Sequence, residues 1–223
     1  METTQAVNFV ETSHVPGPVN FSSTSPSEAI APLVRELLLN LGEDPSREGL
    51  KRTPERVARM YQEILAGYTT DLNSLVNEAI FESKYQEMVL VRDLKFYSLC
   101  EHHMLPFFGQ AHVAYIPDGK IIGLSKIPRL VEMFARRLQV QERLTQQIAE
   151  TLQEIIHPRG IAVVVEGAHL CAMMRGVKKS EARMITSATL GAFRTDDRLR
   201  QDFFNQLQLR PAAASGAEDA GLF

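Results

Sequence analysis

The chain has 223 residues, of which 44% are hydrophobic and 23% are charged, and its formal net charge is −3. This length and composition are typical of a soluble globular protein with one or two domains. The small negative charge provides no overall basic field, so we expect neither nucleic acid nor a membrane surface as a partner. No apolar run is as long as a membrane span.

The N-terminal sequence also carries no targeting signal that we recognise. The first basic residue is Arg35, which argues against a secretory leader or an Arg-rich transit peptide. We therefore expect a cytoplasmic, reducing environment. There, the two cysteines of the chain favour metal binding or catalysis over a disulfide.

The first third of the chain is predicted to be helical after a disordered arm. Residues 1–24 have no helical or strand period and form the expected arm. A helical section is expected over residues 25–86. Its first helix begins at the capping-box pattern of residues 25–28, although Pro32 favours a later start. Its second helix is expected to have Thr53 as the N-cap.

From residue 87 the pattern changes to that of an α+β unit. The predicted elements are strands at 88–99 and 109–116, helices beginning after Ser125 and near Val140, and strands at 161–174 and 183–190. This order predicts a four-stranded antiparallel sheet with two helices on one face. A C-terminal helix capped by Thr195 completes this predicted domain, 87–210, and residues 211–223 are expected to form a flexible tail. Open sheet edges favour oligomerisation.

The clearest chemical pattern is Cys100-Glu101-His102-His103, in the loop of the predicted hairpin. The spacing C-x-x-H lets one tight loop direct a thiolate and an imidazole at the same metal ion. It favours His103 as the ligand and leaves His102 for proton transfer, unless one or both are merely exposed loop histidines. If Cys171 joins them, three ligands meet and a fourth position stays open, as in catalytic zinc sites.

The predicted third strand carries a second polar set. Side chains alternate along a strand, so His169, Cys171, Met173 and Arg175 are expected on one face. The alternative is that Cys171 is an ordinary core cysteine and His169 a hydrogen-bonded core histidine.

Two helix starts carry residues that could bind a nucleotide. Ser125, Lys126 and Arg129 begin the first predicted helix, and a helix N-terminus with such side chains is suited to an anion. The alternative is an ordinary capped helix with solvated charges. Gln141 and Glu142 begin the next helix, where a carboxylate either complements the helix dipole or accepts hydrogen bonds from guanine N1–H and the 2-amino group.

Taken together, these residues resemble the GTP cyclohydrolase I family. The matching motifs are T-P-E-R-V-A at 53–58, S-L-C-E-H-H at 98–103, I-G-L-S-K at 122–126, R-R-L-Q-V-Q-E-R-L-T at 136–145, H-L-C at 169–171 and M-R-G-V at 174–177. The resemblance implies a zinc enzyme that converts GTP and water to formate and 7,8-dihydroneopterin triphosphate, the first step of folate and pterin biosynthesis. It also implies the tunnelling fold and a homodecamer with sites at subunit interfaces.

The resemblance assigns a role to each matching residue. The implied zinc ligands are Cys100, His103 and Cys171. The implied proton-transfer pair is His102 and His169. The implied substrate contacts are Glu142 and Gln141 for guanine, and Ser125, Lys126, Arg129, Arg175 and Arg56 for the triphosphate and ribose. The residues that follow Gly176 resemble those of animal members of the family more than those of enteric bacteria. This similarity does not establish a feedback regulatory protein as a partner.

Two other functions remain as alternatives. A related tunnelling-fold enzyme, such as a nitrile reductase of the queuosine pathway, would use Cys100 or Cys171 as a covalent nucleophile and need no metal. A zinc-stabilised binding module would need a closed site with four ligands, completed by His102 or His169.

Overall fold

The computed structural model describes residues 26–208, so the predicted arm at 1–24 and tail at 211–223 lie outside the described residues. In chain order the elements are α1 (Pro26–Asn40), α2 (Thr53–Ile64), the 3-10 helix η1 (Ala66–Tyr68), α3 (Leu72–Val76), β1 (Ile80–Glu82), β2 (Val89–Cys100), β3 (Pro106–Ile116), β4 (Lys120–Ile122), α4 (Lys126–Ala135), β5 (Leu138–Gln139), α5 (Gln141–Ile156), β6 (Gly160–His169), α6 (Leu170–Met173), β7 (Met184–Gly191), α7 (Ala192–Thr195) and α8 (Asp197–Gln208). Within 26–208, no helix has the length and apolar character needed to cross a membrane.

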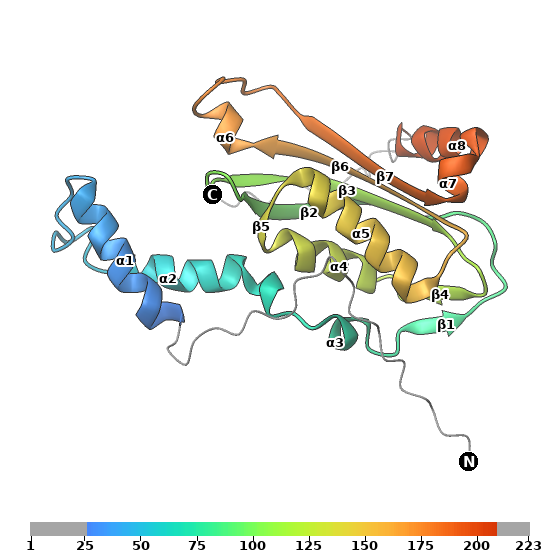
Figure 1. Cartoon of the computed structure of the whole chain (residues 1–223), viewed down its shortest axis with the longest axis horizontal. Helices are drawn as coiled ribbons and strands as arrows, with labels where there is room; N and C mark the ends of the chain where they lie inside the picture. Colours follow the sequence, from blue (N-terminus) through green and yellow to red (C-terminus); the bar gives the residue numbers. More distant parts are fainter. Residues whose placement is uncertain (1–25, 209–223) are drawn as a thin grey trace, which may run out of the picture.

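The main sheet has five strands in the order β5-β2-β3-β6-β7 (Figure 1). The long strands β2, β3, β6 and β7 pair antiparallel, as predicted. The prediction of four strands, all antiparallel, is wrong, because β5 adds a fifth strand parallel to β2. With two residues, β5 is too short for a period-two pattern to reveal it. The α+β class stands, and the tunnelling-fold name stays a prediction.

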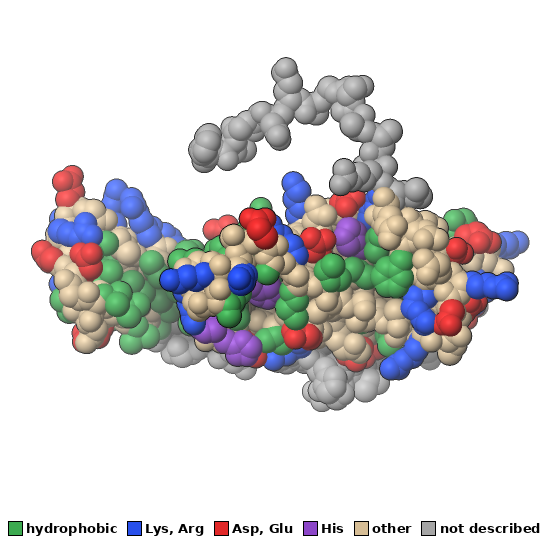
Figure 2. Space-filling view, turned by 90° about the horizontal axis from the view of Figure 1, so that it is seen from above, with side chains coloured by type: hydrophobic (Ala, Val, Ile, Leu, Met, Phe, Trp, Pro, Cys, Tyr) green, Lys and Arg blue, Asp and Glu red, His purple; other side chains and the backbone are tan. Residues whose placement is uncertain are grey.

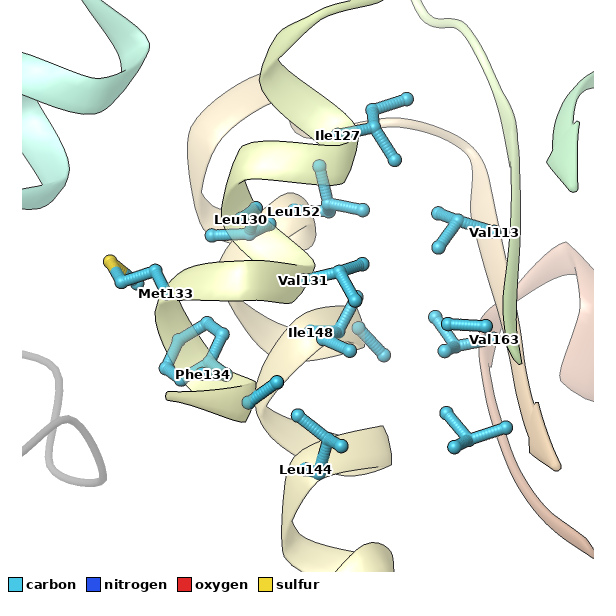
Figure 3. Close-up of a cluster of buried hydrophobic side chains, with 14 of the residues drawn as sticks. Val113, Ile127, Leu130, Val131, Met133, Phe134, Leu144, Ile148, Leu152 and Val163 are labelled. Carbon is cyan, nitrogen blue, oxygen red and sulfur yellow. The ribbon is translucent and has the colours of Figure 1, made fainter. Parts of the chain in front are cut away.

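The main core lies between the sheet and the helices α4 and α5, which cover one face as predicted (Figure 1). Both helices present an apolar stripe to the sheet, and alternate residues of each strand point back at it. Val131 and Ile148 thus face Val113 and Val163 across this layer (Figure 3). This packing fixes the first turn of α5 against the helix-facing side of β6.

The opposite face of the sheet is partly covered by α7 and α8 (Figure 1). Asp196, not Thr195, caps α8: its Oδ1 accepts hydrogen bonds from the backbone N–H groups of Arg198 (2.9 Å) and Leu199 (3.2 Å). The prediction of Thr195 as the cap is therefore wrong by one residue. Thr195 instead ends the preceding turn, α7.

Phe203 is expected to dominate the attachment of α8, because its side chain is fully buried while that of the adjacent Phe204 is 36% exposed. We expect Phe203→Ala to lower the free energy of unfolding by about 3–5 kcal/mol, the usual effect of removing a buried aromatic ring. Phe204→Ala is the matched control and should lower it by about 1 kcal/mol or less. Urea denaturation of both variants measures the difference, and equal losses would contradict the assignment.

The helices α1 and α2 pack against each other beside the sheet unit (Figure 1). α1 begins at Pro26 and continues through Pro32, so Pro32 does not delay its start. It ends at Asn40, and Gly42 follows with a φ of 81°, which glycine readily adopts; the backbone N–H groups of Gly42 and Glu43 bond back to the carbonyls of Leu39 and Leu38. The N-cap of α2 is Arg52 and Thr53 is its first helical residue, so the prediction of Thr53 as the N-cap is wrong and the helix begins one residue earlier than predicted.

The pair α1–α2 leaves an apolar face uncovered within the described chain. The exposed residues are Leu33, Leu37, Leu41 and Met60. Figure 2 shows hydrophobic side chains on the surface of this part of the molecule. Because large exposed apolar patches usually mark contacts, this face is suited to a further protein surface.

A compact set of contacts fastens the helical pair to the sheet unit. The N–H of Gly67 donates to the Arg136 carbonyl at 3.0 Å, and the N–H of Leu138 donates to the Tyr68 hydroxyl at 3.1 Å. The buried Arg137 donates from Nε to the Gly67 carbonyl at 3.1 Å, and its guanidinium lies over the Tyr68 ring. These contacts join η1 to the residues that lead into β5.

Candidate metal centre and active site

The C-E-H-H stretch forms the turn between β2 and β3, as predicted. The Cys100 carbonyl accepts from the N–H groups of His103 (3.3 Å) and Met104 (2.7 Å), which closes a tight turn. Cys100 also pairs with Gln139 of β5, whose carbonyl accepts from the N–H of Glu101 at 3.0 Å. The turn at residues 100–104, called the metal loop below, is therefore held by backbone hydrogen bonds within itself and to β5.

The chain does not continue as a strand after His169, so the predicted strand face of His169, Cys171, Met173 and Arg175 is wrong. The last residue of β6 with a partner on β3 is His169, opposite Phe107, and pairing with β7 already ends at Gly167. Beyond His169 neither β3 nor β7 provides a hydrogen-bonding partner, so the backbone forms its hydrogen bonds within the short helix α6. This turn still carries Cys171 back to the metal loop.

Cys100, His103 and Cys171 come together as predicted. Their ligand atoms all lie within 4.8 Å of one another, with Cys100 buried, Cys171 half-buried and His103 exposed. Burial, and then the adjacent Cys100 thiol, raises the pKa of the Cys171 thiol. Two crowded sulfurs and an imidazole are the donor set of a soft-ligand metal site, where a cation stabilises the thiolates. The described residues thus fit a divalent metal ion.

The histidines that were predicted to transfer protons flank this cluster. Nδ1 of His102 lies 3.8 Å from the Cys100 sulfur. The ring of His169 stacks on Phe107, with centroids 4.6 Å apart and planes 3° apart, and its Nε2 lies 2.9 Å from Oε1 of Gln141. Burial lowers the pKa of His169, an effect partly offset by the carboxylate of Glu142. Figure 2 shows histidine side chains close together near the middle of the view, beside the part of the molecule formed by α1 and α2.

A bidentate ion pair ties the metal loop to α5. Nη1 and Nη2 of Arg143 donate to the two carboxylate oxygens of Glu101 at 2.6 and 3.0 Å. The hydrogen bond from Arg143 is the main reason that the pKa of Glu101 is lowered. The pair holds the loop against the first turn of α5, where Gln141 and Glu142 lie.

Comparison with known proteins identifies the family. A family model described as GTP cyclohydrolase I matches residues 30–208. The chain belongs to the GTP cyclohydrolase I family. A GTP cyclohydrolase 1 of Leptospira biflexa is 57% identical over 176 residues, covering 79% of this chain and 96% of the relative. One from Chlorobaculum tepidum is 59% identical over 170 residues, covering 76% of each chain.

The family resemblance read from the sequence is thereby confirmed, and the chain is an enzyme of this family. Among solved structures, that of the archaeosine synthase QueF-Like in the apo form covers 49% of this chain and 97% of that chain at 16% identity. Its TM-score of 0.39 is too low to support an argument about fold or function.

Some of the substrate contacts implied by the GTP cyclohydrolase I family also lie near the cluster. Glu142 is exposed beside His169, and its carboxylate makes no hydrogen bond within residues 26–208. Arg175 lies close enough for its charge to act on Cys171. Gln141 differs, because its side chain is only 1% exposed and is bonded inside the chain.

The remaining implied contacts lie on other helices of this chain. Ser125, Lys126 and Arg129 belong to the start of α4, whereas the other end of α4 leads into β5 beside Cys100. A helix of 10 residues separates the two ends by about 15 Å. Ser125 precedes α4 without a side-chain cap bond, and Lys126 is largely buried. Arg56 lies on α2.

Three residues at the candidate site were not singled out from the sequence. Phe107 forms the platform under His169, Arg143 clamps Glu101, and Gly167 makes room for the side chain of Gln141. Gly167 lies within the strand predicted at 161–174, and Phe107 lies in the predicted loop before residue 109, so neither position gave a signal of a site. Arg143 lies within the motif at 136–145, but a lone arginine in a helix gives no signal of its partner.

Proposed function

We propose that the chain is a zinc-dependent GTP cyclohydrolase that converts GTP and water to formate and 7,8-dihydroneopterin triphosphate. The observation that carries this proposal is the cluster of Cys100, His103 and Cys171, with His102 and His169 beside it. The family description and the names of the relatives support GTP as the substrate. Three protein ligands are typical of a catalytic zinc, because a structural zinc has four.

The donor set favours zinc over harder cations. Two sulfurs and one imidazole suit Zn²⁺, whereas Mg²⁺ and Ca²⁺ prefer oxygen ligands. When bound, such an ion supplies Lewis acidity that makes water nucleophilic near neutral pH. Within the chain, Cys100, His103 and Cys171 would hold the ion, and the Glu101–Arg143 pair would keep the loop in place.

The reaction requires several proton transfers at the purine. Water adds to C8 of guanine, and a proton on the ring nitrogen accompanies opening of the imidazole ring. A second hydration releases formate, after which the ribose opens, rearranges and closes onto a ring nitrogen. Imidazole is the side chain best suited to such proton transfers, and His102 and His169 both lie beside the cluster.

Binding of the uncleaved parts of GTP positions the base. We assign Glu142 to the guanine edge, because its carboxylate is exposed beside His169. The triphosphate and ribose are assigned to Ser125, Lys126, Arg129, Arg175 and Arg56. Because the triphosphate is not cleaved, its binding energy can serve to hold C8 in place.

We further propose that the active site is completed between subunits of a homodecamer. Ser125, Lys126 and Arg129 lie at the end of α4 away from β5 and Cys100, and we assign the supply of these groups to a second copy. The exposed face of Leu33, Leu37 and Leu41 supports additional contacts between copies. The cytoplasmic location and the division into residues 25–86 and 87–210 stay predictions, and a regulatory protein partner is not established.

One experiment tests this function against its alternatives. The purified full chain is analysed for metal and then incubated with GTP while formate is measured. We expect close to one zinc per chain and formate release that a strong chelator abolishes. Formate release without metal would remove zinc from the proposal. Bound metal with no formate release would favour a binding module, and thiol-dependent chemistry without metal would favour a nucleophilic cysteine.

A further inference from the structure

The amide of Gln141 is buried between the first turn of α5 and the sheet, and its surroundings determine which way it points. Its Nε2 lies 3.0 Å from the Val165 carbonyl, 2.9 Å from the Met184 carbonyl and 3.1 Å from Oγ1 of Thr186. Turning the amide around would place its oxygen against two carbonyl oxygens. The nitrogen must therefore face the strands β6 and β7.

The neighbouring hydroxyl groups agree with this orientation. Oγ1 of Thr145 donates its proton to the backbone carbonyl oxygen of Gln141 at 2.7 Å. At its 2.6 Å contact with Thr186, Thr145 can then only accept, so Thr186 is the donor. The Thr186 oxygen is left to accept from Nε2 of Gln141. Each proton in this buried network has one consistent place.

With the nitrogen fixed, Oε1 of Gln141 is the atom that faces Nε2 of His169 at 2.9 Å. An amide oxygen carries no hydrogen, so Nε2 of His169 must be the donor, and Nδ1 of the neutral ring keeps the lone pair. Gly167 permits this contact, because a Cβ at that position would lie 2.3 Å from Oε1 of Gln141. Stacking on Phe107 fixes the plane of the same ring.

We propose that Gln141 is a positioning residue that holds His169 in the Nε2–H tautomer, so that Nδ1 is the nitrogen that exchanges protons with the substrate. This inference rests on the proposed function, in which His169 transfers protons. It replaces the contact with guanine that the family resemblance implies for Gln141. The buried amide nitrogen already has three acceptors inside the chain.

The tautomer can be read directly by solid-state NMR of the full-length protein labelled with ¹⁵N-histidine, at about pH 8, where an imidazole is neutral. The chain has six histidines, so His169→Asn identifies the signal of His169. We expect a protonated Nε2 and an unprotonated Nδ1 in the unmodified protein. A protonated Nδ1 would overturn the proposal whatever any variant does, and this readout does not depend on activity towards GTP.

Gln141→Met keeps the volume of the side chain and removes Oε1. We expect the signal of His169 to become a mixture of tautomers, and kcat for formate release to fall about 10- to 100-fold, the usual effect of losing an orienting partner. The KM for GTP should change little. The matched control is Gln146→Met, the same substitution at an exposed position of α5 whose amide is bonded to Glu150, and it should leave tautomer and kcat close to those of the unmodified protein.

The kinetic outcome also distinguishes the competing roles. A rise in KM with an unchanged kcat and tautomer would assign Gln141 to the guanine instead. A loss of stability with neither kcat nor tautomer changed would make it a purely structural residue. If the unmodified protein released no formate from GTP, the proposed function would fail, while the tautomer assignment would still be decided by its own spectrum.

Discussion

Cys171→Ser is expected to lose metal and activity together. A serine hydroxyl does not ionise near neutral pH, so it cannot replace the thiolate in a set of three ligands. Removing a partner that merely orients a ligand costs about 10- to 100-fold in metal affinity or activity, and removing a ligand should exceed this. Metal analysis after gel filtration and formate release from GTP measure the two losses on the same sample.

Ala172→Ser is the matched control, because it places the same hydroxyl one residue along α6. It should retain metal and most of the activity, which would show that α6 tolerates serine. A fully active Cys171→Ser protein without metal would remove the metal from the mechanism. An inactive Cys171→Ser protein that keeps its metal would instead indicate a nucleophilic cysteine, as in the alternative reductase.

The sequence predicted those parts of the site that depend on local structure. The strands on either side of Cys100 are long, and their alternating apolar residues place the C-E-H-H stretch in a hairpin turn. The start of α5 was likewise placed correctly, since an apolar stripe defines that helix. Long helices and strands can be predicted from their periodic pattern of apolar residues, and the positions of the residues next to them in the chain can then be predicted as well.

The parts that could not be predicted depend on neighbours that are distant in sequence. The apolar run through β6 gives no sign of where the strand ends. Its last pair with β3 is His169 with Phe107, and its pairing with β7 already ends at Gly167. The orientation of Gln141 depends on carbonyl groups of β6 and β7, which no side-chain pattern encodes. The separation of Ser125 from Cys100 follows from the direction of α4 relative to the sheet.

GTP is expected to be favoured over ATP by a factor on the order of 10⁴ in kcat/KM, because a site built to accept hydrogen bonds strongly rejects a ligand that lacks the donors. Guanine offers N1–H and a 2-amino group to the carboxylate of Glu142, whereas adenine offers neither at these positions. ITP keeps N1–H but lacks the 2-amino group, so it should fall between the two. Formate release from each nucleotide gives the order.

Glu142→Gln tests whether this carboxylate is the origin of the discrimination. The amide keeps one acceptor, so kcat/KM for GTP should fall roughly 10- to 150-fold, which corresponds to the loss of one hydrogen bond to a charged group. The matched control is Glu150→Gln, which removes the same charge further along α5, where Glu150 is bonded to Gln146. Comparable turnover of ATP and GTP by the unmodified protein would refute the assignment. Equal losses in the two variants would mean that the charge of α5, rather than a contact with guanine, is what the enzyme needs.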